Sequence, residues 1–211
     1  MSLTVLPGVF RPISDSWFLA EEVSARSRPG MRVLDVCTGS GVIAIAAAEQ
    51  GADVDAVDRS RRAVSTVRLN ARRRGLMLRA HRGNLFDSVA DRRFDLISAN
   101  PPYVPHPDPH PPTRGSARSW AAGPTGRAVL DVICDACPAH LEPGGMVLLV
   151  QSSLIGEQAT LHRLTRAGLR NAEVIARQRG PLGPLMRRQR GMGLIPADVV
   201  SEDLIIVGAR A

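Results

Sequence analysis

Short apolar runs alternate with amphipathic segments of helical length along most of the chain. The apolar runs predict strands over 32–36, 53–57, 77–82, 94–99, 145–150, 170–176 and 203–208. The longer segments predict helices over 14–25, 42–48, 60–74, 125–140 and 155–167, the first with Ser14 or Asp15 as its cap. Strands that alternate with such helices form a mainly parallel sheet covered on both faces. We therefore expect an α/β fold built on a seven-stranded sheet.

Two segments interrupt this alternation. Residues 104–118 are rich in proline, and residues 178–196 place arginines among glycines and prolines. Both are expected to be long loops, which at the rim of an active site usually act as lids or contact the substrate. With 211 residues the chain is long enough to bury a full core. We expect one domain over 1–211, with a helical lead-in over 1–30 and an active-site loop over 104–124.

The net positive charge of the chain favours an acidic binding partner. The formal net charge is +7, and all 27 basic residues are arginines. An excess of positive charge is typical of proteins that work near nucleic acid or the ribosome. Aromatic residues make up only 3% of the chain, too few to build a base-stacking platform. Contact with RNA or with the ribosome is therefore expected through charge.

Disulfides, metal sites and membrane segments find little support. Three cysteines are too few for a disulfide framework, and Cys134 and Cys137 are expected to be buried apolar residues of a helix. Prolines separate His106, Asp108 and His110, and no further cluster of ligands follows, so we expect no metal site. No apolar run has the length of a membrane span, and the first residues lack a signal-peptide pattern, which favours a cytoplasmic location.

A glycine turn follows the strand over 32–36. The run Thr38-Gly39-Ser40-Gly41 opens the next helix and satisfies the pattern G-x-G-x-x-G/A. Such a turn lets the backbone approach a ligand closely and directs free N–H groups toward it. Asp58 ends the second strand, where it can accept hydrogen bonds from ribose hydroxyls. These features fit a nicotinamide dinucleotide nearly as well as S-adenosylmethionine.

Two further residues favour S-adenosylmethionine. Asp35 lies four residues before Gly39. A carboxylate in the cofactor turn attracts the ammonium and sulfonium of S-adenosylmethionine and repels a diphosphate. Asn84 follows the third strand, where the amino group of an adenine needs an acceptor.

The run Asn100-Pro101-Pro102-Tyr103 follows the strand over 94–99. The nitrogen of an amide or an aromatic amine is a weak nucleophile, because its lone pair is delocalised into the adjacent π system. Fixed acceptors hold its hydrogens and draw it toward a methyl group, so orientation and electrostatic preorganisation supply most of the rate. Pro102 stiffens the turn and Tyr103 can pack against the flat group. The run therefore indicates methylation of a planar nitrogen.

Together these motifs resemble the HemK/PrmC group. The resemblance extends to the opening segment Phe10-Arg11-Pro12-x-x-Asp15-Ser16, to Gly83-Asn84-Leu85-Phe86-Asp87 and to Trp120-x-x-Gly123-x-x-Gly126-Arg127. It implies a Rossmann-like class I methyltransferase with an antiparallel C-terminal strand. It also implies transfer of a methyl group from S-adenosylmethionine to a glutamine side-chain amide of a peptide-chain release factor.

The resemblance also implies the site residues. The Asn100 side-chain oxygen and the Pro101 carbonyl would accept the hydrogens of the substrate nitrogen. The implied catalytic residues are Asn100, Pro101, Pro102 and Tyr103. The implied cofactor-binding residues are Asp15, Ser16, Asp35, Thr38, Gly39, Gly41, Asp58, Arg59, Asn84, Leu85 and Asn100.

Some features depart from the group. Asn84 replaces an acidic residue, and Trp17 stands where bacterial members often carry an acid. The chain enters the catalytic pattern almost at once, which resembles the short branch without the helical N-terminal domain that grips the release factor. Members of this branch often need a small zinc-binding activator that covers an apolar flank of the sheet.

Several functions stay open at this point. A nucleic-acid adenine or guanine amino methyltransferase uses the same Asn-Pro-Pro-Tyr chemistry and suits the basic charge. Methylation of a small-molecule amine or amide, a nicotinamide oxidoreductase and a non-catalytic protein that binds S-adenosylmethionine are further alternatives. Under any of these, the run Arg187-Arg188-Gln189-Arg190 is expected to contact an RNA-rich or acidic partner.

Overall fold

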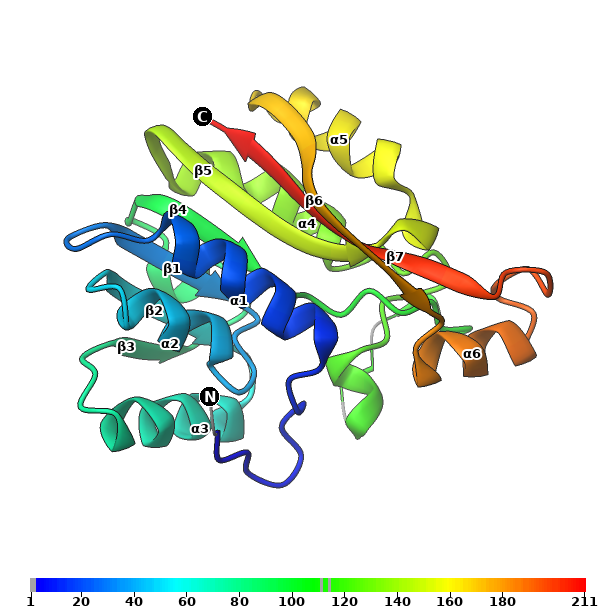
Figure 1. Cartoon of the computed structure of the whole chain (residues 1–211), viewed down its shortest axis with the longest axis horizontal. Helices are drawn as coiled ribbons and strands as arrows, with labels where there is room; N and C mark the ends of the chain where they lie inside the picture. Colours follow the sequence, from blue (N-terminus) through cyan, green and yellow to red (C-terminus); the bar gives the residue numbers. More distant parts are fainter. Residues whose placement is uncertain (1–2, 111, 114) are drawn as a thin grey trace.

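The computed structural model describes residues 3–110, 112–113 and 115–211, and in this part of the chain a single sheet organises the fold (Figure 1). The sheet has seven strands in the order β3-β2-β1-β4-β5-β7-β6. The strands β1 to β5 pair in parallel, and β7 runs antiparallel to both β5 and β6. The strands are β1 Arg32–Val36, β2 Asp53–Asp58, β3 Arg79–Arg82, β4 Phe94–Ala99, β5 Leu141–Ser152, β6 Arg170–Pro181 and β7 Ser201–Arg210. The predicted seven-stranded α/β fold with an antiparallel C-terminal strand is confirmed.

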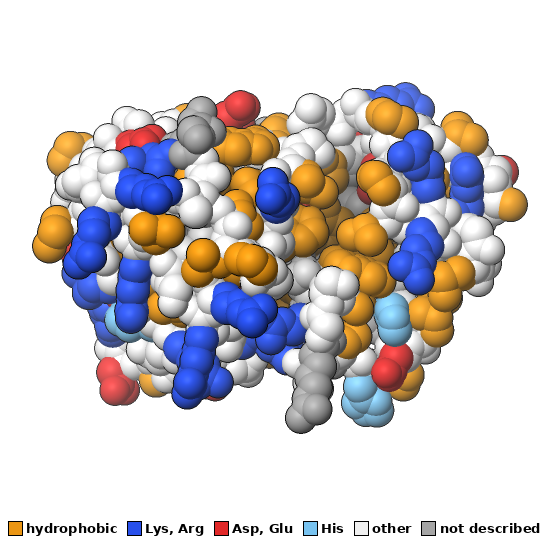
Figure 2. Space-filling view, turned by 90° about the horizontal axis from the view of Figure 1, so that it is seen from below, with side chains coloured by type: hydrophobic (Ala, Val, Ile, Leu, Met, Phe, Trp, Pro, Cys, Tyr) orange, Lys and Arg blue, Asp and Glu red, His pale blue; other side chains and the backbone are white. Residues whose placement is uncertain are grey.

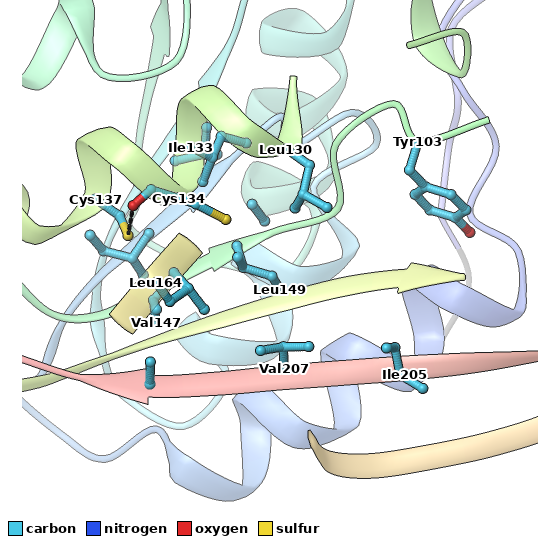
Figure 3. Close-up of a cluster of buried hydrophobic side chains, with 14 of the residues drawn as sticks. Tyr103, Leu130, Ile133, Cys134, Cys137, Val147, Leu149, Leu164, Ile205 and Val207 are labelled. Carbon is cyan, nitrogen blue, oxygen red and sulfur yellow. Dashed lines mark hydrogen bonds between the residues drawn. The ribbon is translucent and has the colours of Figure 1, made fainter. Parts of the chain in front are cut away.

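Helices cover both faces of the sheet, as predicted. Residues of α1 (Ser14–Arg26), α2 (Val42–Ala48) and α3 (Arg61–Arg73) share one hydrophobic core. Residues of α4 (Leu130–Ala136), α5 (Glu157–Arg166) and α6 (Pro184–Gly191) belong to the core on the other face, part of which is drawn in Figure 3. Cys134 and Cys137 are buried in this second core, as the sequence predicted. No helix among the described residues combines the length and the apolar character needed to cross a membrane.

Alternating side chains of the central strands feed the two cores. On β1, Val33 joins the core beneath α1 and α2, whereas Leu34 joins the core beneath α4. On β4, Leu96 and Ile97 divide in the same way. All four side chains are almost fully buried. A sheet buried on both faces requires apolar residues at consecutive positions, which is why these strands read as continuous apolar runs.

The strand order reverses between β1 and β4. From β1 the chain proceeds outward to β2 and β3 and then returns to place β4 on the other side of β1. In the parallel pairing, Val36 of β1 lies beside Ala99 of β4. The glycine turn and the Asn-Pro-Pro-Tyr run, which follow these two residues, therefore emerge side by side. In open α/β sheets such a switch point is where ligands bind.

Residues 178–196 do not form the long loop that was predicted. The strand β6 continues through Pro181 because it pairs with β7 along most of its length. The helix α6 then begins at Pro184, directly after Gly183. Proline is well suited to the first turn of a helix, where its missing N–H is not needed. Glycine and proline therefore mark a helix start here, and not a loop.

Three smaller expectations also change. The predicted helix over 125–140 is confined to α4 and a 3₁₀ turn over Cys137–His140, and residues 125–129 form turns. The cap of α1 is Ile13, without a side-chain hydrogen bond, and neither Ser14 nor Asp15 caps the helix. The Pro-rich segment forms a bridge between Val104 and Ala121 and a 3₁₀ turn, η2, over Ser116–Ser119. Positions 111 and 114 of this segment lie outside the described residues.

Candidate active site

A cavity of about 280 Å³, called the first cavity, lies at the carboxyl ends of β1, β2 and β4. Figure 2 views the end of the molecule that carries the lead-in segment, η2 and α6. Hydrophobic side chains gather there in a central hollow, and Arg side chains stand on both sides of it. Eight of the predicted cofactor residues line the first cavity. They are Ser16, Thr38, Gly39, Asp58, Arg59, Asn84, Leu85 and Asn100.

Left-handed backbone shapes the wall of the first cavity and the glycine turn behind it. Gly39 and Gly41 have φ angles of +53° and +83°. A Cβ atom added to Gly41 would lie 2.9 Å from Cγ2 of Val67, so glycine is required both by the turn and by the contact between α2 and α3. Cys37 and Leu85, which also line the cavity, adopt positive φ angles of 60° and 49° without being glycine. Such strained residues gather at binding sites, where the surrounding structure holds them in place.

Asp58 joins the glycine turn to the start of α3. Its Oδ2 atom accepts a 3.0 Å hydrogen bond from the Gly39 N–H, and its Oδ1 atom accepts a 2.8 Å bond from the Ser60 N–H. Burial raises the pKa of this carboxyl above its usual value, and the two N–H donors oppose that shift. Each carboxylate oxygen keeps further acceptor capacity. The arrangement suits a ligand with hydroxyl donors, such as a ribose.

Asp35 lies behind the first cavity and does not line it. Its side chain is fully buried, and its Oδ1 atom accepts a 2.9 Å hydrogen bond from Ser98 of the neighbouring strand β4. Its Oδ2 atom has no hydrogen-bond partner among the described residues. Burial raises the pKa of Asp35 from 3.8 to about 7. Asp35 was predicted to contact the cofactor directly, but it lies beneath the glycine turn and does not line the first cavity. Gly41 likewise does not line this cavity.

A second cavity, of about 400 Å³, adjoins the first. All four predicted catalytic residues, Asn100 to Tyr103, line it. Its far wall comes from the end of β6, the start of α6 and Glu202 of β7. The segment over 178–196, which was expected to be a long loop, thus supplies a strand end and a helix start to the wall of this cavity.

Asn100 stands where the two cavities meet, since it lines both. Its Nδ2 atom donates a 3.1 Å hydrogen bond to Ser16 Oγ, which in turn donates a 3.0 Å bond to Asp15 Oδ1. Because the Ser16 hydroxyl donates to a carboxylate, it can only accept from Asn100. The Asn100 carboxamide is therefore oriented, and its oxygen is left to accept a bond from a ligand.

Residues of the opening segment contact both ends of the Asn-Pro-Pro-Tyr run. Asp15 and Ser16 are buried in the first turn of α1, and Asp15 lines the second cavity, not the first. The Tyr103 hydroxyl donates a 2.7 Å hydrogen bond to the other oxygen of Asp15. Phe10 lines both cavities.

The structure adds residues that sequence reasoning missed. Arg118 and Ser119 of η2 line the first cavity, and Arg118 donates a 2.9 Å hydrogen bond to Ser60 Oγ beside Asp58. Glu202 reaches the second cavity from β7. The predicted active-site loop over 104–124 includes η2, but no sequence signal singled out Arg118 or Ser119, and none pointed to Glu202.

Gly126 holds the segment after Tyr103 in place. It has a φ angle of +73°, and a Cβ atom added to it would lie 2.4 Å from the Tyr103 carbonyl oxygen. The bonds from Val104 N–H to the Trp120 carbonyl and from His106 N–H to the Gly123 carbonyl tie the same two segments together. The predicted element after the catalytic run thus packs directly against it.

These features match a family of known proteins. The methyltransferase small domain model matches residues 2–112 of the chain, which include both motifs. The chain belongs to this family. The family match and the relatives described below together establish an S-adenosylmethionine-dependent N-methyltransferase.

Two curated relatives agree with this assignment. The methyltransferase is 33% identical over 175 residues to the release factor glutamine methyltransferase of Geobacter sulfurreducens, covering 80% of this chain and 61% of the relative. It is 32% identical over 188 residues to a protein of Methanocaldococcus jannaschii, provisionally assigned as a protein N5-glutamine methyltransferase, covering 88% of this chain and 93% of the relative. The resemblance to the HemK/PrmC group, stated from the motifs, is confirmed.

A solved structure shares the fold of the methyltransferase. In the Mtq2–Trm112 complex of E. cuniculi, described as responsible for the methylation of the eRF1 translation termination factor, one chain superposes with a TM-score of 0.69 and 21% identity. The match covers 96% of this chain and 98% of that chain. Among the described residues of the methyltransferase, no group of three or more His, Cys, Asp and Glu side chains could hold a metal ion.

Proposed function

We propose that this methyltransferase modifies a glutamine side-chain amide of a peptide-chain release factor. The observation that carries the proposal is the position of Asn100 at the junction of the two cavities, with its amide oriented by Ser16. The names of the curated relatives support the choice of glutamine as the acceptor. The whole Asn-Pro-Pro-Tyr run lies within residues 2–112, the part of the chain that the family model matches.

In this proposal the first cavity holds S-adenosylmethionine. Asp58 accepts the ribose hydroxyls, Asn84 and Leu85 lie against the adenine, and the glycine turn packs beneath the ligand. Arg59, Thr38 and Ser16 complete the wall. When bound, S-adenosylmethionine supplies an electrophilic methyl group. Asp35 contributes from beneath the turn, where its carboxyl favours a cationic ligand.

The second cavity holds the acceptor amide. The Asn100 side-chain oxygen and the Pro101 carbonyl accept the two hydrogens of the substrate nitrogen, and this interaction localises its lone pair toward the first cavity. Pro102 stiffens the turn, and the ring of Tyr103 packs against the planar amide. The rate comes from orientation and from acceptors fixed in advance, and the reaction does not need a strong base.

We also propose an electrostatic contact beyond the second cavity. Arg179, Arg187 and Arg188 are exposed on β6 and α6, the elements that form the far wall. Cations at this rim suit an acidic partner such as the ribosomal RNA around a release factor. This function also predicts a cytoplasmic location, because translation termination takes place there. If RNA is bound through these arginines, the affinity should fall steeply with salt, and a flat response would reject the contact.

A small activator subunit is a further part of the proposal. The related solved structure is a complex with Trm112. In this chain β3 is an edge strand, and Met77, just before it, is 90% exposed. We propose that a small zinc-binding partner covers this flank. Copurification of such a subunit, lost on Met77→Asp, would support the contact, and full solubility and activity of the isolated chain would argue against it.

The decisive experiment follows the label from radioactive S-adenosylmethionine. The purified chain is incubated with release factor and, in parallel, with total RNA, DNA and a cell extract. We expect label in the release factor that disappears when its acceptor glutamine is replaced. Label only in nucleic acid or in small molecules would reject the release factor as the substrate. The protein would then be an N-methyltransferase that acts on another class of substrate.

Asn100→Ala serves as the mechanistic control. It should reduce methyl transfer by about a thousandfold or more, because the oriented acceptor is lost. The dissociation constant for S-adenosylmethionine should stay within a few-fold of the original. Undiminished turnover by the variant would reject the assigned role of Asn100.

A further inference from the structure

Glu202 lies in the wall of the second cavity with one carboxylate oxygen unused. The residue is only 9% exposed and belongs to β7, about 100 positions from the catalytic run. Its Oε1 atom accepts a 2.8 Å hydrogen bond from the Gly183 N–H at the start of α6. Its Oε2 atom is buried and has no hydrogen-bond partner among the described residues.

A buried carboxylate oxygen without a partner is unfavourable, because the water that it loses on burial is not replaced. The other carboxylate of the same cavity differs in this respect. Both oxygens of Asp15 are engaged, one by the Tyr103 hydroxyl and one by the Ser16 hydroxyl. Glu202 therefore offers an acceptor that is anchored on one side and free on the other.

We propose that Glu202 determines acceptor specificity by accepting a hydrogen bond from an N–H group of the substrate backbone next to the methylated amide. The proposal rests on the proposed function, since it concerns the same acceptor. A backbone N–H supplies the missing partner without bringing a charge into the cavity. The bond also fixes the direction of the acceptor chain across the cavity, from β7 toward the Asn-Pro-Pro-Tyr run. Because Asp15 and Glu202 both line the cavity, an acidic residue beside the acceptor glutamine should be disfavoured.

The substitution Glu202→Gln tests this directly. The glutamine keeps an oxygen for the Gly183 N–H and turns the free acceptor into an NH₂ donor, which faces the substrate N–H unfavourably. We expect the KM for the release factor to rise about tenfold or more, with kcat and the dissociation constant for S-adenosylmethionine nearly unchanged.

The neighbouring Asp203→Asn is the matched control. It removes the same charge from the same strand, but Asp203 pairs with Arg177 and lines neither cavity. Its KM for the release factor should stay within about twofold of the original value. Equal effects of the two substitutions would show that only the charge of the strand matters and would overturn the proposal.

A second measurement uses the unmodified protein, in case Glu202→Gln lowers the melting temperature. Acceptor peptides are made in which an ester replaces the amide on either side of the glutamine, so that one backbone N–H is absent. One of the two esters should raise the KM about tenfold with the original protein. In the Glu202→Gln variant the same ester should not raise the KM further, because the N–H that it removes has already lost its acceptor.

The outcomes separate the two proposals. If the original protein methylates the release factor and neither the variant nor the esters change the KM, the role of Glu202 is wrong and the proposed function stands. If Glu202→Gln lowers kcat or cofactor binding alone, the residue is structural and the specificity role is again wrong. If the original protein does not label the release factor, the proposed function fails, and this acceptor contact fails with it.

Discussion

The hydroxyl of Tyr103 donates a 2.7 Å hydrogen bond to Asp15, although the two residues lie 88 positions apart. The bond joins the first turn of α1 to the end of the catalytic run. Burial, and then the nearby Asp15 carboxylate, raises the pKa of Tyr103 well above its usual value, so the hydroxyl stays protonated and remains a donor. Together with the Ser16–Asn100 bond, it fastens both ends of the Asn-Pro-Pro-Tyr run to one carboxylate.

Tyr103→Phe should therefore lower both activity and stability. The variant leaves Asp15 Oδ2 buried without its donor, which should cost about 1–3 kcal/mol in the free energy of unfolding. We expect kcat to fall about tenfold, because the run is no longer held at its Tyr103 end. Urea unfolding and steady-state kinetics measure the two effects.

A double-mutant cycle provides the control. Asp15→Ala and Tyr103→Phe remove the same contact, so their combined effect on unfolding should be smaller than the sum of the single effects. Strictly additive values would mean that the two side chains do not interact, and would contradict the geometry.

Asp58 should control cofactor affinity without affecting the acceptor. Asp58→Ala removes the carboxylate that accepts from Gly39 and Ser60 and that lines the first cavity. We expect the dissociation constant for S-adenosylmethionine to rise about tenfold or more, by the loss of hydrogen bonds to a charged acceptor. Isothermal titration calorimetry measures it. Asp53→Ala, at the other end of β2 and paired with Arg79 on the surface, should bind normally, and equal losses in both variants would reject the assignment.

Gly126→Ala should displace the catalytic run. The new methyl group would approach the Tyr103 carbonyl to 2.4 Å, on a residue with φ of +73°. We expect a loss of about 2 kcal/mol or more in the free energy of unfolding and a reduced kcat. Gly75→Ala is the matched control, because its φ is +66° and no described atom lies within 4 Å of the added Cβ. It should cost only about 1 kcal/mol and leave kcat unchanged.

Asp35 should make stability depend on pH. Its pKa of about 7 in the folded protein exceeds the ordinary value of 3.8, so the folded state holds the proton more tightly than the unfolded chain. The stabilisation is complete below about pH 4 and is lost as the pH rises toward 7, by an amount on the order of 4 kcal/mol. Asp35→Asn, which keeps an oxygen for Ser98, should therefore be more stable than the original at pH 8 and gain nothing at pH 4. A difference between the two proteins that stays constant from pH 4 to 8 would show that Asp35 does not titrate in this way.

The sequence by itself determined the order of the elements and the residues of the cofactor turn. Apolar runs at β1, β2 and β4 identify strands because a sheet covered on both faces needs apolar residues at consecutive positions. The glycine turn and the Asn-Pro-Pro-Tyr run could be recognised from the sequence, because each consists of consecutive residues whose chemistry depends on their order in the chain. Knowing that both follow parallel strands was enough to place them at one edge of the sheet.

Only the tertiary structure decided what surrounds those motifs. No sequence pattern singled out Arg118 or Glu202, although both reach the cavities. Arg118 lies within the predicted active-site loop over 104–124, whereas Glu202 lies outside every segment predicted to belong to the site. The segment over 178–196 reads as a loop by composition, yet pairing with β7 extends β6, and Pro184 starts a helix. Likewise, Asp35 lies beneath the turn and Asp15 faces the second cavity because packing between α1, β1 and β4 sets the direction of each side chain. These contacts join residues distant in the chain, and which side chains meet depends on strand order and packing, which local patterns do not contain.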